Sequence, residues 1–116
     1  MTEHPLHAFR LTVREEPATL TVRISGDLDH DTGPELVDAV SDHLTPGVRD
    51  VRLDFHALGH IDSLGLSALL MVHRRTSAAG AALHLDHRPA ALERVLRQTN
   101  VLTHLTGAVG PAAPHP

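Results

Sequence analysis

The chain has 116 residues, a formal net charge of −4 at pH 7 and a hydrophobic fraction of 41%, which is material for one domain with one core. It has no cysteine, which excludes disulfides, thiol nucleophiles and cysteine-ligated zinc. Its ten basic residues are scattered and its two aromatic residues are both phenylalanine, a composition that argues against direct nucleic-acid binding.

Two segments near the N-terminus, residues 8–14 and 19–25, alternate between apolar and polar side chains. This period of two predicts two strands, each with one buried face. The short polar stretch between them predicts a hairpin. The apolar positions are Phe9, Leu11, Val13, Leu20, Val22 and Ile24.

A helix is expected to begin at Thr32, because Thr32 followed by Glu35 matches a capping box. Its apolar positions have helical spacing, and the helix should stop before Pro46 and Gly47. These apolar positions are Leu36, Ala39, Val40 and Leu44.

The second half of the chain alternates strands and helices. Strands are predicted at residues 51–55 and 81–85, and helices at residues 64–78, closed by Gly80, and from Pro89 to Asn100. The buried stripe of the helix over residues 64–78 is expected to contain Leu66, Leu69, Leu70 and His73.

This order predicts an α/β fold with a mixed, mostly parallel sheet of four to five strands. Because the strands alternate with polar residues throughout, the helices are expected on one face only. Residues 1–107 are interpreted as one domain, and the Pro/Ala-rich residues 108–116 as a disordered tail. The longest apolar runs are too short to span a membrane and the N-terminus does not resemble a signal peptide, so a cytoplasmic location is expected.

The segment from Leu58 to Leu66 joins a predicted strand to a predicted helix, at the sheet edge where functional loops gather. Ser63 falls at the start of that helix, where free amides favour a negative charge such as a phosphate. The simpler alternative is that Asp62 or Ser63 only caps the helix.

Two motifs resemble those of one family. Ile61-Asp-Ser-Leu-Gly-Leu-Ser-Ala-Leu-Leu70 looks like the core motif of the bacterial anti-sigma factor antagonists, a group of the STAS (sulfate transporter and anti-sigma factor antagonist) domains. Gly26-Asp-Leu-Asp-His-Asp-Thr32 resembles the family's loop before its first helix. The resemblance covers roughly residues 8 to 105 and implies a STAS-like wind with the helices on one face.

The resemblance also implies a function. Members bind an anti-sigma factor that is itself a serine kinase and thereby release a sigma factor, and phosphorylation of the serine after the motif's Asp ends the interaction. Here that serine is Ser63. Two departures are Leu64, where many members have Ser or Thr, and a C-terminal region shortened to residues 102–109.

The residues expected to contact the partner surround Ser63, and the acidic ones have an alternative interpretation as local turn caps. No catalytic residue, cofactor or metal is assigned, and the interpretation is a non-enzymatic regulatory module. A weak homodimer is compatible with it. The expected contact residues are Asp27, Asp29, His30, Asp62, Ser63, Leu64 and Gly65.

Three alternatives remain open from the sequence. A serine hydrolase is disfavoured because Ile61, rather than glycine, lies two residues before Ser63. A metal- or small-ligand-binding protein is suggested only by histidine pairs without a strong ligand spacing. A STAS subunit of another assembly, in lipid transport or stress signalling, would not need phosphorylation of Ser63. The histidine pairs are His4 and His7, His56 and His60, and His84 and His87.

Overall fold

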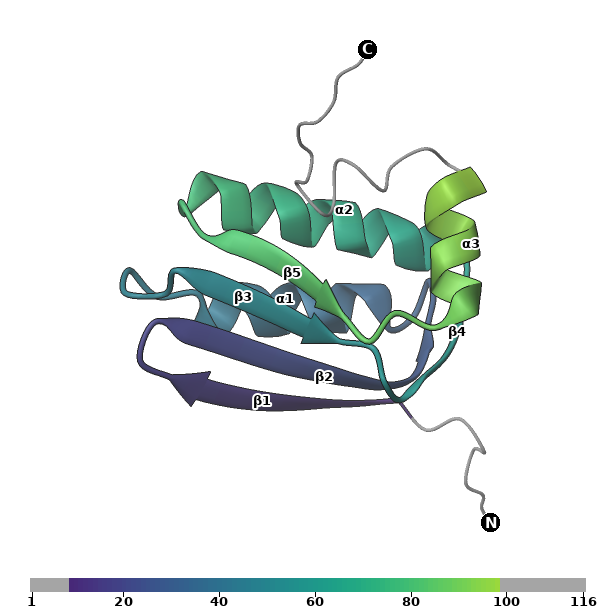
Figure 1. Ribbon diagram of the computed structural model, residues 1–116, viewed down its shortest axis with the longest axis horizontal. Helices are drawn as coiled ribbons and strands as arrows, with labels where there is room; N and C mark the ends of the chain where they lie inside the picture. Colours follow the sequence, from purple (N-terminus) through teal and green to yellow (C-terminus); the bar gives the residue numbers. More distant parts are fainter. Residues whose placement is uncertain (1–8, 99–116) are drawn as a thin grey trace.

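Five strands and three helices follow one another along residues 9–98, the residues described by the structure, a computed structural model (Figure 1). They are β1 (Arg10–Glu16), β2 (Thr19–Leu28), α1 (Gly33–His43), β3 (Asp50–Asp54), β4 (Leu58–Ile61), α2 (Ser63–Ala78), β5 (Ala82–Asp86) and α3 (Ala90–Gln98). The strand and helix order agrees with the sequence prediction except for β4. The predicted tail, 108–116, lies outside the described residues.

The main path of the sheet runs β1-β2-β3-β5. β1 pairs antiparallel with β2 in the predicted hairpin, whose last pair is Glu16 with Thr19. β3 is parallel to both β2 and β5. The α/β class and the mixed, mostly parallel sheet are therefore confirmed.

β4 lies in the segment where the sequence pattern predicts only a connection between a strand and a helix. It pairs in parallel with the last three residues of β2, with a register shift between Gly26 and Asp27. The prediction ended the second strand at residue 25, whereas β2 continues to Leu28. β4 was missed because it is short and contains an exposed glycine and an exposed histidine, so it carries little strand signal of its own.

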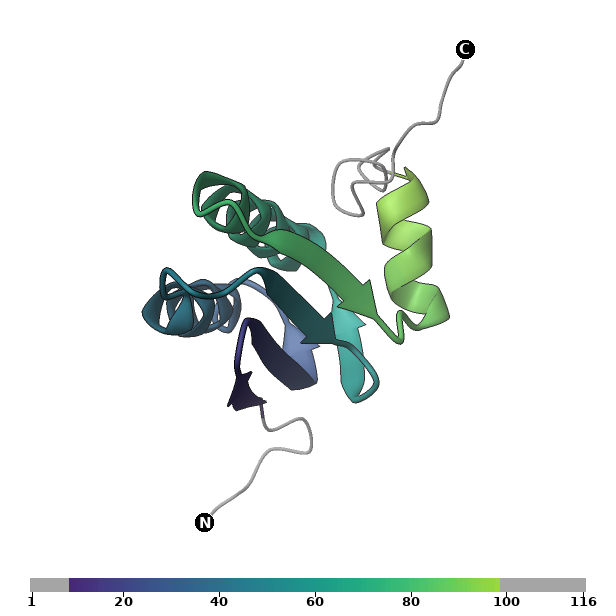
Figure 2. The same cartoon turned by 60° about the vertical axis from the view of Figure 1, so that its left-hand side comes forward.

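The helices α1 and α2 lie side by side against one face of the sheet (Figures 1 and 2). The strands turn their apolar residues toward these helices, as Val51 and Leu53 in β3 illustrate, and both are fully buried. α3 lies at the end of the sheet near β4 and the start of α2, and it buries Leu92 and Leu96 in the same core.

The opposite face of the sheet is polar, because most of the alternate residues of the strands are polar or charged. Side chains on this face contact one another across the strands. Arg52 and Arg23 form ion pairs with Asp86, at 2.9 Å, and Asp54, at 3.3 Å, and the rings of His84 and His87 lie within hydrogen-bond distance of Asp50, at 2.8 Å, and Asp54, at 3.0 Å. This face bears out the prediction that the alternating strands have one side toward water.

The helices correct two details of the prediction and confirm a third. Thr32 is the N-cap of α1 by position, but its side chain makes no capping hydrogen bond, so the predicted capping box is wrong. In α2 the fully buried positions include Val72 and Thr76, whereas His73 is only half-buried. The predicted closure by Gly80 is correct, since Gly80 has a φ of +75° and donates to the carbonyl of Ser77.

Candidate functional site

The start of α2 is fixed by Asp62. Its side-chain carboxylate accepts hydrogen bonds from the backbone amides of Leu64, at 3.0 Å, and Gly65, at 2.9 Å. These bonds satisfy two of the amides that a helix N-terminus leaves free. The capping alternative is therefore correct for Asp62 and does not apply to Ser63.

Ser63 is the first residue of α2 and is exposed. Within residues 9–98 its hydroxyl makes no hydrogen bond, while its backbone carbonyl accepts one from the hydroxyl of Ser67 at 3.2 Å. The helix does not need the Ser63 side chain, because Asp62 supplies the cap. A group attached to the Ser63 oxygen would thus point into solvent without removing a structural contact.

Gly65 is buried against the end of β2. A Cβ atom at this position would overlap the carbonyl oxygen of Leu28 and lie 3.0 Å from the side chain of Ile61. The same Leu28 carbonyl accepts a hydrogen bond from the amide of Asp62 at 3.4 Å. Gly65 therefore has no surface for a partner, and its expected role in binding is indirect: it lets the first turn of α2 touch the end of β2.

The loop between β2 and α1 is organised by Thr32 and Asp29. The Thr32 hydroxyl donates to the carbonyl of Asp27 at 2.7 Å and accepts from the amide of Asp29 at 2.9 Å. The Asp29 carboxylate accepts from the amides of Thr32, at 3.2 Å, and Asp31, at 3.0 Å. These bonds explain why Thr32 does not cap α1 with its side chain: the loop uses its hydroxyl.

The carboxyl of Asp29 has a pKa below its ordinary value of 3.8, chiefly because the backbone amide of Thr32 donates to it. Asp29 is thus an ionised turn residue, which supports the alternative that part of the acidic loop is structural. Its neighbour His30 is exposed and lies 3.2 Å from the carboxylate of Asp31. His30 is therefore accessible to a partner in a way that the Asp29 carboxylate, already engaged, is not.

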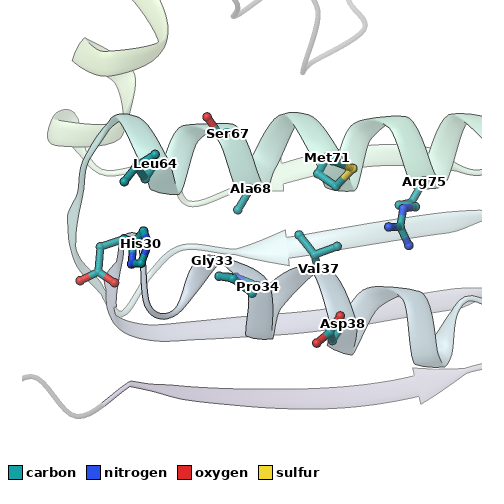
Figure 3. Close-up of a pocket in the computed structure, with 11 residues that line it drawn as sticks. His30, Gly33, Pro34, Val37, Asp38, Leu64, Ser67, Ala68, Met71 and Arg75 are labelled. Atoms are coloured by element: carbon teal, nitrogen blue, oxygen red, sulfur yellow. The ribbon is translucent and has the colours of Figure 1, made fainter.

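A groove of about 420 Å³ runs between α1 and α2, beginning at Leu64 and His30 (Figure 3). At its floor Gly33 approaches Ala68 so closely that an added Cβ would lie 3.0 Å from the Ala68 Cβ. About two helical turns further on, Arg75 donates to the Ser41 hydroxyl at 2.9 Å. Because Gly33 meets Ala68 near the start of both helices and Ser41 meets Arg75 near their ends, α1 and α2 run parallel, and both N-termini lie at the Ser63 end.

The comparison with known families decides the assignment of this chain. The family model described as "Mlab, STAS domain" matches residues 11–107. The chain belongs to the STAS domain family. The family resemblance inferred from the two motifs is therefore confirmed.

Solved structures share the fold of this STAS domain. An anti-sigma factor antagonist from Mycobacterium paratuberculosis has a TM-score of 0.70 at 20% identity, covering 90% of this chain and 87% of that one. The anti-sigma factor antagonist SpoIIAA in its unphosphorylated form has a TM-score of 0.63 at 23% identity, covering 78% and 82%. A putative anti-sigma factor antagonist from Thermotoga maritima has a TM-score of 0.70 at 21% identity, covering 78% and 79%.

The fold also occurs within longer proteins. This STAS domain matches the structure of Mglu with a TM-score of 0.62 at 22% identity, over 70% of this chain but only 20% of the Mglu chain. The chain thus spans about a fifth of the Mglu protein that it matches. At these identities the structural comparisons establish the fold.

The histidines of the STAS domain do not gather into a metal centre within the described range. No three histidine, aspartate or glutamate side chains from 9–98 come together as ligands. His84 and His87 pair with carboxylates on the polar sheet face, and the rings of His56 and His87 meet edge to face at 6.2 Å. His4 and His7 lie outside the described residues.

The structure brings most of the expected site residues to one end of the sheet, and it adds one feature that the sequence analysis missed. Ser63, Leu64 and Asp62 lie at the start of α2, and β4 places them beside the end of β2, which carries Asp27. The missed feature is the groove.

No helix of the described residues is long and apolar enough to cross a membrane.

Proposed function

We propose that this STAS domain is an anti-sigma factor antagonist that binds an anti-sigma serine kinase while Ser63 is unphosphorylated and so releases a sigma factor. Phosphorylation of Ser63 ends the binding. The observation that carries this proposal is the exposed, unbonded Ser63 hydroxyl at the first position of α2, next to a cap that Asp62 provides independently. The fold shared with SpoIIAA, whose structure is that of an unphosphorylated form, supports it.

The proposed chemical step is a phosphoryl transfer from ATP held by the kinase. The Ser63 oxygen forms the new bond to the γ-phosphorus, the bond from that phosphorus to ADP breaks, and the hydroxyl proton passes to a base of the kinase. The STAS domain supplies only the acceptor hydroxyl and its position. It is a substrate and binding partner in this scheme and performs no catalysis itself.

The phosphate would change the charge at the binding surface far more than the stability of the domain. It adds about 1.5 to 2 negative charges at neutral pH. The Asp62 carboxylate caps the amides of Leu64 and Gly65 whether or not Ser63 is phosphorylated, so the phosphate removes no structural contact. A partner that buries Leu64 against its own surface would have to desolvate the adjacent phosphate.

Partner contacts are proposed for the accessible residues around Ser63. Leu64 is 49% exposed and offers an apolar anchor, and His30 is an exposed polar neighbour. Asp27 is half-buried beside β4, with its carboxylate close to Gly59. Asp29 and Asp62 act mainly by holding the two loops in place, because their carboxylates accept backbone amides.

The decisive experiment incubates the purified chain with candidate anti-sigma kinases and ATP and locates phosphate by mass spectrometry. Ser67→Ala is the matched control, because Ser67 is an exposed serine one turn further along α2. Phosphate should appear in the wild type and in Ser67→Ala and be absent from Ser63→Ala. Undiminished incorporation into Ser63→Ala would disprove the assignment of the acceptor.

A second measurement tests whether phosphorylation blocks binding. Titration calorimetry should give an affinity at least about tenfold weaker for the chain phosphorylated at Ser63 than for the unmodified chain, which corresponds to about 1.4 kcal/mol. Ser63→Ala should bind as the unmodified chain does. Equal affinities of the phosphorylated and unmodified forms would leave a constitutive binding module.

A second candidate function is a STAS subunit of a different assembly. It is favoured by one observation: the matching family model is described by Mlab and not by an anti-sigma factor antagonist. Affinity purification of the chain from its native cells separates the two. Recovery of a serine kinase without a sigma factor supports the first function, whereas a stable complex without a kinase and without phosphate on Ser63 supports the second.

A further inference from the structure

The groove between α1 and α2 has apolar walls, unlike the polar open face of the sheet. Leu64 and Met71, at 49% and 37% exposure, are the large hydrophobic side chains that the described residues leave exposed. Both line this groove, spaced seven residues apart on α2, and Ala68 lies between them. Pro34 and Val37 form the opposite wall on α1. Figure 3 shows Ala68 directed from α2 toward α1, and Val37 directed from α1 toward α2.

The groove has a defined length. It begins at Leu64 and His30 and is closed at its far end by the hydrogen bond from Arg75 to Ser41. From position 64 to position 75 an α-helix rises by roughly 16 Å, which matches about three helical turns of an occupant. Apolar residues that line a groove at intervals of three, four and seven on two parallel helices are the features that receive the apolar side of a third helix.

The charged residues beside the groove are mostly acidic, and they favour a helix with basic residues. The exposed side of α1 carries Glu35, Asp38 and Asp42, and Asp29 and Asp38 line the groove itself. The α2 wall contributes one cation, Arg75, which is already bound to Ser41. An occupant with arginine or lysine along the edge that faces α1 would therefore be complementary, and an acidic one would be repelled.

We infer that this groove is a docking site for an amphipathic helix of a partner protein, with leucine-like residues in contact with Leu64, Val37 and Met71 and with cationic residues against α1. The inference concerns a surface beside Ser63 and is independent of whether Ser63 is phosphorylated. It specifies the chemistry of the partner segment: about three turns, apolar on one side and basic at one edge.

The test uses the isotope-labelled full chain and three synthetic peptides of roughly 12 residues, about three turns. The first is a helical peptide with leucines on one side and arginines along one edge. The second replaces its arginines by glutamates, and the third is a scrambled sequence of the first. Amide chemical shifts report where each peptide binds.

The arginine peptide should shift the resonances of Val37, Ala68 and Met71, and bind at least about tenfold more tightly than the other two. Met71→Gln should weaken its binding at least about threefold, because a polar group then enters the apolar wall. Ser77→Gln is the matched control, since Ser77 is exposed on the same helix but does not line the groove. Asp38→Asn should also weaken binding and reduce its dependence on salt.

Three results would overturn the inference. The first is equal affinity for the arginine and scrambled peptides. The second is a set of shifted resonances that lies outside the groove. The third is concentration-dependent self-association of the chain, measured by sedimentation, that Met71→Gln abolishes and Ser77→Gln does not, which would make a second copy the occupant. None of these results bears on the phosphorylation of Ser63, so failure here is distinguishable from failure of the proposed function.

Discussion

The α-carbon of Gly65 lies so close to the carbonyl group of Leu28 that a Cβ at position 65 would be 2.8 Å from the carbonyl carbon and would overlap the oxygen. Two segments that are 37 residues apart in the chain, the end of β2 and the first turn of α2, are held in contact at this point. The proposed phosphorylation site is the residue two positions before this contact. Its position in space therefore depends on the absence of a side chain at Gly65.

Gly65→Ala should accordingly destabilise the domain. The overlap is with backbone, which cannot rotate away, so we expect a loss of about 1 to 3 kcal/mol or more in the free energy of unfolding, as in other overpacked sites. Urea denaturation measures it. Gly47→Ala is the control, because nothing lies within 4 Å of a Cβ at Gly47, and it should change stability by less than about 0.5 kcal/mol. Equal effects of the two substitutions would contradict the packing argument.

A second prediction follows from the fact that Asp62, and not Ser63, caps α2. Asp62→Ala removes the carboxylate that caps two amides of α2 and should cost about 0.5 to 2 kcal/mol. Ser63→Ala removes an unbonded hydroxyl and should cost less than about 0.5 kcal/mol. Thermal denaturation followed by circular dichroism compares them. A larger loss for Ser63→Ala would show that its hydroxyl is structural.

A third prediction concerns Thr32, whose hydroxyl is both donor and acceptor in the loop before α1. Thr32→Val keeps the shape but leaves the Asp27 carbonyl and the Asp29 amide without this partner, and should cost about 1 to 3 kcal/mol. Thr32→Ser retains the hydroxyl and should recover most of that loss. Denaturant unfolding of both variants checks this. A loss of stability in Thr32→Ser as large as that in Thr32→Val would attribute the effect to the methyl group of Thr32 and not to its hydroxyl.

The fourth prediction is a pH dependence at Asp54. Desolvation of its carboxyl raises the pKa, but hydrogen bonds from the backbone amide of His56, the ring of His87 and the guanidinium of Arg23 outweigh it, so the pKa is lower than the ordinary 3.8. A carboxyl whose pKa is lower in the folded than in the unfolded state stabilises the domain at any pH above its unfolded-state pKa. This stabilisation is lost as the pH falls through the folded-state pKa.

Asp54→Asn should therefore be less stable than the wild type at neutral pH, and the difference should shrink as the pH falls below about 3.8. Urea unfolding across an acidic pH series measures the difference. Asp42→Asn serves as a control, since Asp42 is exposed on α1. A stability difference for Asp54→Asn that is constant with pH would rule out the ionised carboxylate as its source.

The sequence predicts most of the fold because the alternation of Leu20, Val22 and Ile24, and of Val51, Leu53 and Phe55, reflects burial that the structure confirms. β4 could not be predicted in this way, since its pairing depends on the extension of β2 past the register shift at Gly26.

Two features of the site depended on contacts that a linear pattern does not contain. The capping box at Thr32 had the right residue types, but the loop's hydrogen bonds use the Thr32 hydroxyl. At the groove Gly33 lies close to Ala68. These two residues are far apart in the sequence and come into contact only when α1 and α2 pack side by side. By contrast, the position of Ser63 at the start of α2 was predictable, because the signals that begin this helix are local in the sequence.

The polar face of the sheet has a consequence for architecture. Its cross-strand ion pairs, such as Arg52 with Asp86, leave it without an exposed large apolar side chain among the described residues, whereas Leu64 and Met71 are both on the helical side. The two sides of the domain therefore differ: ion pairs and water satisfy the polar groups of one, whereas the other carries the exposed apolar side chains that are typical of interaction surfaces. The same fold also occurs within a longer chain, since the match to Mglu covers only 20% of that chain.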